Sequence, residues 1–166
     1  MAATIVVVKT HGAVGYETES TDTIFGLKSV DDHATAPEDA PVQIPDSPGT
    51  NYSYECWMRF KCTAAPSNQC DNFKVWGSGA SVGTGLVITV NTDAVAVYAT
   101  PVVTDSAQGT RASFASHGSG AKISVAGTLV NIGDKSDFSV FQLEVSETAT
   151  PGDIADQTVY YSYDES

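Results

Sequence analysis

One short motif in the chain has the letters of a catalytic serine site. Residues 79–83, Gly-Ala-Ser-Val-Gly, match the pattern G-x-S-x-G, which in α/β-hydrolases holds a nucleophilic serine on a tight turn between a strand and a helix. Here the motif belongs to a glycine-rich stretch, and residues 86–90 after it, Leu-Val-Ile-Thr-Val, are typical of a strand. We therefore expect a flexible turn at this motif, and we do not expect an enzyme.

Histidines and carboxylates are the other candidates for chemistry. His11, His33 and His117 stand far apart in glycine-rich or acidic segments, without the paired spacing of a zinc site, so we expect surface histidines. Residues 31–39 carry four carboxylates and residues 134–137 carry two. Calcium takes about six to eight oxygen ligands, and neither segment has the spacing of a calcium-binding loop. We expect solvated acidic loops, no metal and no cofactor.

The three cysteines are predicted to be reduced and buried. Cys56 and Cys62 are six residues apart on one predicted strand, which separates them by about 20 Å and prevents a bond between them. Cys62 and Cys70 could meet across a hairpin. An odd number of cysteines without a CxxC pair nevertheless favours free thiols.

Composition limits the classes of partner. The chain has 166 residues, of which 20 are acidic and 8 are basic, for a formal charge of −12. This length fits one domain, and this charge repels nucleic acid and anionic membranes. The first nine residues lack the basic segment and the long apolar run of a secretion signal, and no apolar run approaches the roughly 18 residues of a membrane span. We expect no nucleic-acid or membrane partner.

The strongest structural signal is the alternation of residues 52–63. One set of alternate residues is mostly apolar, and the other set is polar except for Trp57. A period of two over this length predicts a long β-strand with one face in a core. Together with the alternation in residues 138–146, it predicts a core that includes Tyr54, Cys56, Met58, Phe60, Phe141, Leu143 and Val145.

Further β-branched and aromatic runs are separated by turn residues and predict short strands. They are residues 4–10, 23–28, 72–76, 86–90, 94–100, 122–125, 128–132, 138–146 and 158–163. The chain is therefore predicted to be all-β, a single-domain antiparallel β-sandwich or jelly roll. Its N-terminal strands occupy residues 1–28, an extended arm occupies residues 29–50, and the sandwich occupies residues 51–166.

The arm in residues 29–50 differs in composition from the rest of the chain. It contains four prolines, five carboxylates and no Lys or Arg. Proline restricts the unfolded chain, so ordering such a segment on a surface loses less entropy. We consider two positions for it: a strap across a neighbouring subunit, with Val42 and Ile44 as apolar anchors, or a cover over an edge of its own sandwich.

Basic and aromatic residues gather near the long predicted strand. Trp57, Arg59 and Lys61 share one face of it, and Lys74 and Trp76 come close if residues 72–76 form its hairpin partner. Trp and Arg are enriched at protein interfaces, which makes these five residues candidates for a contact patch. Alternatively, the Arg and Lys stems pack over an aromatic ring on an outer face. The sequence favours neither.

Three stretches resemble small β-sandwich structural proteins of tailed bacteriophages. They are Tyr-Glu-Cys-Trp-Met-Arg-Phe-Lys-Cys-Thr at 54–63, Asn-Phe-Lys-Val-Trp at 72–76, and a C-terminal segment with Thr-Pro-Gly at 150–152 and Tyr-Ser-Tyr-Asp-Glu at 161–165. The resemblance runs from about residue 50 to the end. It implies a virion component assembled in the host cytoplasm, a capsid decoration or cement protein or another accessory head or tail protein. Such a protein binds other virion proteins, the major capsid protein among them, forms homo-oligomers in the particle and has no catalytic residues.

A second function agrees with the same fold. Aromatic rings with one exposed side are suited to contacts with sugars or receptors. On this hypothesis the chain is a carbohydrate- or receptor-binding module of the adhesin or tail-fibre kind, and its candidate residues are Trp57, Trp76, Tyr160 and Tyr163.

Overall fold

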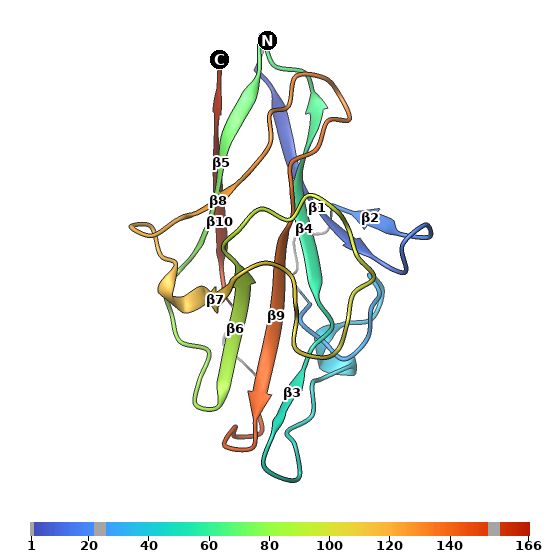
Figure 1. Ribbon diagram of the computed structural model, residues 1–166, viewed down its shortest axis with the longest axis vertical. Helices are drawn as coiled ribbons and strands as arrows, with labels where there is room; N and C mark the ends of the chain where they lie inside the picture. The colour runs from blue at the N-terminus through green and yellow to red at the C-terminus, as the bar shows by residue number, and fades with distance from the viewer. Residues whose placement is uncertain (1, 22–25, 153–156) are drawn as a thin grey trace.

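The computed structural model describes residues 2–21, 26–152 and 157–166, and it consists almost entirely of β-structure (Figure 1). Strands account for 39% and helix for 4%, and the helical residues described form the short 3₁₀ turns η1 (Pro37–Asp39) and η2 (Phe114–Ser116). The prediction of an all-β antiparallel sandwich is confirmed. Among the described residues, no helix has the length and apolar character needed to cross a membrane.

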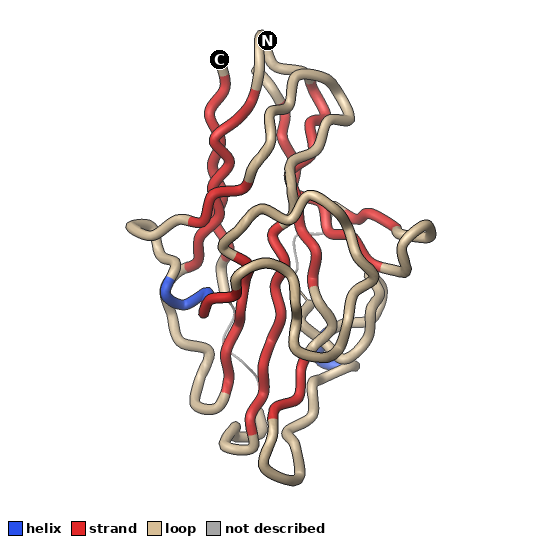
Figure 2. The backbone as a smooth tube through the Cα atoms, in the orientation of Figure 1, coloured by secondary structure: helices blue, strands red, loops and turns tan. Residues whose placement is uncertain are grey.

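Two antiparallel sheets pack against each other, the smaller on the left in Figure 2. The larger has the order β2-β1-β4-β9-β6-β7, with β3 also paired to β9, and the smaller has the order β10-β5-β8. The strands are β1 (Thr4–His11), β2 (Thr18–Ser20), β3 (Thr50–Tyr52), β4 (Cys56–Ala64), β5 (Cys70–Gly77), β6 (Leu86–Asn91), β7 (Arg111–Ser113), β8 (Ile123–Val125), β9 (Ser139–Ser146) and β10 (Val159–Glu165).

The strand predicted for residues 52–63 is divided into β3 and β4. The division falls at residues 53–55, where the Ser53 amide donates to the Leu143 carbonyl at 2.9 Å and the Ser53 hydroxyl accepts from the Leu143 amide at 2.9 Å. Because the strand is interrupted here, Tyr54 is only half-buried, and its assignment to the core is wrong. The other six predicted core residues are buried.

The main core lies between the two sheets and is built from alternate residues of their strands. Phe60 of β4 stacks on Phe73 of β5 with 4.8 Å between ring centroids. Full burial of an apolar side chain of this size contributes roughly 1.5–3 kcal/mol, so the alternation fixes which face of each strand turns inward. Further members of this core are Ile5, Cys56, Met58, Cys62, Cys70, Val75, Val90, Ile123, Val125 and Phe141.

A second apolar cluster lies on the outer face of the larger sheet. Trp57 is fully buried there against Phe138, and Tyr98 packs edge-on against Trp57 at 5.1 Å between centroids. The segment between β6 and β7 crosses in front of β4 and β9 in Figure 1 and covers this face. The strand predicted for residues 94–100 is therefore wrong: the segment is a loop with one bridge, Val95 to Phe138, and its side chains cover Trp57.

Other predicted strands also differ from the structure. Residues 128–132 form a single bridge, between Cys70 and Leu129. Of the strand predicted at 23–28, residues 23–25 lie outside the described residues, and residues 26–28 are not in a strand. β2 and β7 were not predicted, because three residues are too few for a periodic pattern. The three cysteines are free and buried, as predicted.

The arm in residues 29–50 lies on its own sandwich. Its first part closes into a loop, because the Ser29 amide donates to the Ala40 carbonyl at 2.9 Å. In its second part Val42 and Ile44 are half-buried and line a hollow whose other side is the inner face of β6 and β9. The arm thus folds back on its own sandwich, as in the second position considered above, but the hollow that Val42 and Ile44 line lies at the interior strands β6 and β9 and not at an edge strand. A strap across a neighbouring subunit stays a prediction.

Candidate functional site

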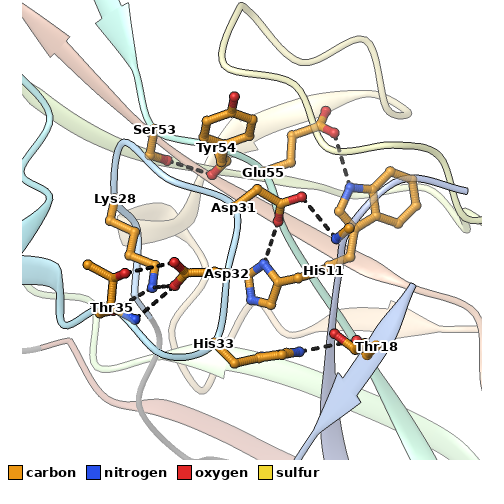
Figure 3. Close-up of polar contacts among 12 residues, drawn as sticks. His11, Thr18, Lys28, Asp31, Asp32, His33, Thr35, Ser53, Tyr54 and Glu55 are labelled. Atoms are coloured by element: carbon orange, nitrogen blue, oxygen red, sulfur yellow. Dashed lines mark hydrogen bonds and ion pairs between the residues drawn. The ribbon is translucent and has the colours of Figure 1, made fainter. Parts of the chain in front are cut away.

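A buried polar cluster joins the end of β1 to the start of the arm (Figure 3). The Nδ1 atom of His11, the last residue of β1, lies 2.6 Å from Oδ1 of Asp31. The second oxygen of Asp31 accepts a hydrogen bond from the Gly12 amide at 2.9 Å. His11 is only 6% exposed, so the expectation of a surface histidine is wrong for this residue. The Asp31 carboxylate therefore holds the arm against the strand end.

His33 completes this cluster from the arm side. Its ring meets the ring of His11 edge-on, with 4.3 Å between centroids. Its Nε2 lies 3.1 Å from the Thr18 carbonyl, which can only accept, so Nε2 carries the proton. Its Nδ1 is buried without a hydrogen-bond partner among the described residues. Burial lowers the pKa of His33; the hydrogen bond to the Thr18 carbonyl acts to raise it, and the electrostatic interactions with His11 and Lys9 act to lower it.

The acidic segment at residues 31–39 is a folded turn. The Lys28 ammonium donates to Oδ1 of Asp32 at 2.8 Å, and Lys28 is 4% exposed. The Asp32 carboxylate also accepts from the amide and hydroxyl of Thr35, at 2.8 and 2.7 Å. These hydrogen bonds hold the pKa of Asp32 well below its usual range, and the one from Lys28 has a larger effect than those from Thr35. These charges therefore shape the turn, and within the described ranges no three His, Cys, Asp or Glu side chains are placed to hold a metal ion.

A second buried network explains where the candidate Trp57 lies. Glu55 is fully buried, and its carboxylate accepts from the Trp57 indole at 3.0 Å, from the Val102 amide at 3.3 Å and from the Ser106 hydroxyl. Gln142, also fully buried, accepts from the Ser106 amide at 3.0 Å. A buried carboxylate is tolerated when several donors satisfy it. Trp57 is therefore an internal donor that helps to fix the covering loop.

Arg59 and Lys61 belong to an ion cluster on the larger sheet. With Lys135 they surround the carboxylate of Glu19 on β2, at nitrogen–oxygen distances of 2.5, 3.1 and 2.7 Å respectively. Burial acts to raise the pKa of Glu19, but the hydrogen bonds from Lys135, Arg59 and Lys61 prevail and lower it to about 2. The Arg59 guanidinium also lies 4.4 Å from the centroid of the Phe138 ring. The sequence did not indicate Glu19, because its partners are distant along the chain.

Lys74 and Trp76 lie elsewhere, on β5 of the smaller sheet. β4 and β5 are not hydrogen-bonded neighbours, and the alternate residues Phe73 and Val75 of β5 point into the core that Phe60 of β4 also enters. Lys74 and Trp76 therefore face away from the larger sheet. The single patch that the hairpin assumption suggested does not form, and the five candidates are divided between two outer faces.

The outer face of the smaller sheet carries an aromatic and basic group, which we call the Trp76 face. The rings of Trp76 and Tyr160 stack with 5.8 Å between centroids at 18°, because the register of β5 and β10 pairs these two residues. The Lys122 ammonium lies 4.1 Å from the centroid of the Trp76 ring, and Lys74 donates to the Ser124 hydroxyl at 2.8 Å. Tyr160 is 46% exposed. The sequence indicated Trp76 and Tyr160 singly, but not their pairing or Lys122.

The structure also locates two further candidates from the sequence, the motif serine Ser81 and the aromatic residue Tyr163. Ser81 of the G-x-S-x-G motif lies in an irregular loop between β5 and β6, where its hydroxyl accepts from the Gly83 amide at 3.3 Å, without the strand-and-helix context of a nucleophile. Tyr163 packs against the main core, 6.0 Å from the Phe73 ring. Of the four aromatic candidates for sugar binding, Trp76 and Tyr160 thus remain on an outer face.

Comparisons of the chain with family models, curated proteins and solved structures found no match.

Proposed function

We propose that the protein is a non-enzymatic structural component of a bacteriophage virion, of the capsid decoration or cement type, that docks on other virion subunits such as the major capsid protein. The observation that supports this most directly is the Trp76 face. It presents a stacked Trp and Tyr pair with two lysines, and aromatic side chains with a polar rim are characteristic of protein interfaces.

The electrostatic contrast of this face supports the same function. The chain carries 20 acidic and 8 basic residues, yet two of the basic side chains, Lys74 and Lys122, lie on the Trp76 face. Complementary charge on a partner fixes orientation and speeds encounter. An acidic or amide-rich patch on a capsid subunit would suit this face, whereas the strongly acidic remainder of the chain disfavours unspecific adhesion to nucleic acid.

The buried charged groups support a role without catalysis. The carboxylates of Asp31, Glu55 and Glu19 contact backbone amides, an indole, hydroxyls or cations of the protein itself. All of these contacts except the Glu55–Trp57 bond join segments that are distant in the chain. Carboxylates that are paired inside the protein stabilise its fold, as a structural component of a particle requires. They give no support to an acid–base reaction.

The second candidate function is carbohydrate or receptor binding on the same two rings. A sugar stacks on an open ring face, but one face of the Trp76 ring is already covered by the Lys122 ammonium. This contact favours protein docking, where Lys122 can pair with a carboxylate of the partner. Binding of a glycan array by the wild type, lost in Tyr160→Ala, would favour the carbohydrate function instead.

The experiment uses particles of the phage that encodes the chain. Mass spectrometry of density-purified particles should detect the protein, and purified protein should rebind to particles from which it has been removed. Trp76→Ala and Lys122→Glu should weaken rebinding about tenfold or more, since they remove central interface groups. Tyr16→Ala, at a ring 87% exposed on the β1–β2 loop, is the matched control. Absence of the protein from particles, or equal rebinding by all variants, would contradict the proposal.

A further inference from the structure

The smaller sheet ends in a long open strand. β10 (Val159–Glu165) has seven residues and pairs with β5 on one side, and in Figure 1 it runs beside β5 to the C-terminus. Within the described part of the chain the other terminal strands, β2, β7, β8 and β3, have three residues each. An open edge offers a row of unpaired backbone groups to another strand, and β10 is the longest such row described.

The side chains of β10 indicate that this edge is made for contact. Tyr161 points inward, 5.8 Å from the Phe60 ring, and yet it is 48% exposed. Tyr160 points outward and is 46% exposed. Half-exposed rings therefore lie on both faces of the same edge. Native sheets commonly block such edges with charged residues, Lys above all, and with Pro. β10 contains no Lys, Arg or Pro, and its two charged residues, Asp164 and Glu165, stand at its C-terminal end.

We infer that β10 pairs antiparallel with β10 of a second copy of this chain, so that two three-stranded sheets join into one of six strands. A two-fold axis at Tyr161 places residues of equal parity opposite each other, as a continuous sheet requires. Tyr161 then meets the Tyr161 of the second copy, and Tyr160 lies opposite Ser162. The inference does not rest on the proposed virion function, since it concerns the strand edge and not the Trp76 face.

The charges of the strand agree with a second copy as the occupant. In this register Asp164 and Glu165 lie opposite Thr158 and Gln157, so no carboxylate opposes another. Residues 159–163, Val-Tyr-Tyr-Ser-Tyr, are uncharged. The chain as a whole carries −12, so two copies repel each other at long range. Because salt screens charges over about 10 Å at 0.1 M, added salt should strengthen the dimer.

Oligomeric state tests the inference. Light scattering coupled to size exclusion, from micromolar to near-millimolar protein, should show a mass that rises from one chain towards two, and more readily in added salt. Tyr161→Lys puts an inward-pointing charge on the edge and should weaken the dimer about tenfold or more, equivalent to about 1.4 kcal/mol. Tyr16→Lys, the same change at an exposed tyrosine of the β1–β2 loop, should leave it unchanged.

A crosslink tests the register independently of these variants. Directly opposite residues in antiparallel strands have Cβ atoms about 4.5–5.5 Å apart, close to the spacing of a disulfide. Tyr161→Cys should therefore give a disulfide-linked dimer under mild oxidation, and Tyr16→Cys should not. The three native thiols are buried and do not compete.

The outcomes decide the inference. A monomer at every concentration, or a dimer that responds equally to Tyr161→Lys and Tyr16→Lys, overturns it, and neither result bears on docking through Trp76. If Tyr161→Lys does not fold, the crosslink decides: a Tyr161→Cys dimer supports the inference, and its absence overturns it.

Discussion

Phe60 on β4 and Phe73 on β5 stack across the two sheets, with ring centroids 4.8 Å apart and planes inclined by 22°. Both side chains are fully buried, and they come from strands that share no backbone hydrogen bonds. The attachment of the smaller sheet to the larger one therefore depends on side-chain packing, to which this pair and the contact of Phe60 with Tyr161 contribute.

Replacing Phe60 by Ala should lower the free energy of unfolding by about 3–5 kcal/mol, because it removes a buried ring and leaves a cavity. Urea denaturation measures the change. Ile132→Ala, at a side chain that is 70% exposed, is the control and should change stability by less than about 0.5 kcal/mol. Equal effects of the two substitutions would contradict the assignment of Phe60 to the core.

Stability should decrease as the pH falls from 7 to 5, in part through His33. Its pKa is lowered in the folded protein, so below the unfolded value of about 6.5 the unfolded chain takes up a proton that the folded chain does not. The contribution of His33 is therefore present above that pH and is lost below it. His33→Gln keeps a donor for the Thr18 carbonyl and should show a smaller pH slope than the wild type, with His117→Gln as control. Identical slopes for the wild type and His33→Gln would contradict this.

Glu19 should contribute stability that disappears in acid. Its folded pKa of about 2 lies below the ordinary value of 4.5, so its contribution is complete above pH 4.5 and is lost as the pH falls towards 2. At pH 7, Glu19→Gln should destabilise the protein by about 1–3 kcal/mol, because charged hydrogen bonds are lost. The exposed Glu38→Gln is the control. The difference in free energy of unfolding between the two variants should become smaller in high salt, because salt screens ionic interactions. A difference that does not change with salt would contradict an ionic cause.

The cysteines should react only after unfolding. All three are free and buried, and burial raises the pKa of Cys56 to about 12, which leaves little thiolate at neutral pH. Alkylation of native protein at pH 8 should be slow, and mass spectrometry after denaturation should find three modified thiols. A Cys62–Cys70 disulfide in unreduced protein would contradict the structure.

The local part of this fold could be predicted from the sequence, whereas the long-range contacts could not. Cys56, Met58 and Phe60 follow a period of two, and this period alone indicates which face of β4 is buried. The polar face of the same strand left the position of Trp57 open between a contact patch and packing on the outer face, because the loop that buries it lies some 40 residues later in the chain. No local pattern carries that information.

The candidate site shows the same division. Trp76 was indicated as an aromatic residue on an outer face of a strand, but its pairing with Tyr160 depends on the register between β5 and β10. Likewise His11 was expected on the surface, and Asp31 was expected in a solvated loop. The two side chains meet only because the arm closes over the end of β1. Tertiary contact decides both positions.

The pairing of β5 with β10 also has a consequence for synthesis of the chain. About 80 residues separate the end of β5 from the start of β10, which corresponds to roughly 4–16 s of translation at about 5–20 residues per second. During that interval β5 can pair with β8 but not with β10, so the smaller sheet, whose apolar face carries Phe73 and Val75, is incomplete. Sheets closed by such distant segments fold slowly, so the apolar face of the smaller sheet stays partly uncovered in the nascent chain until β10 is made.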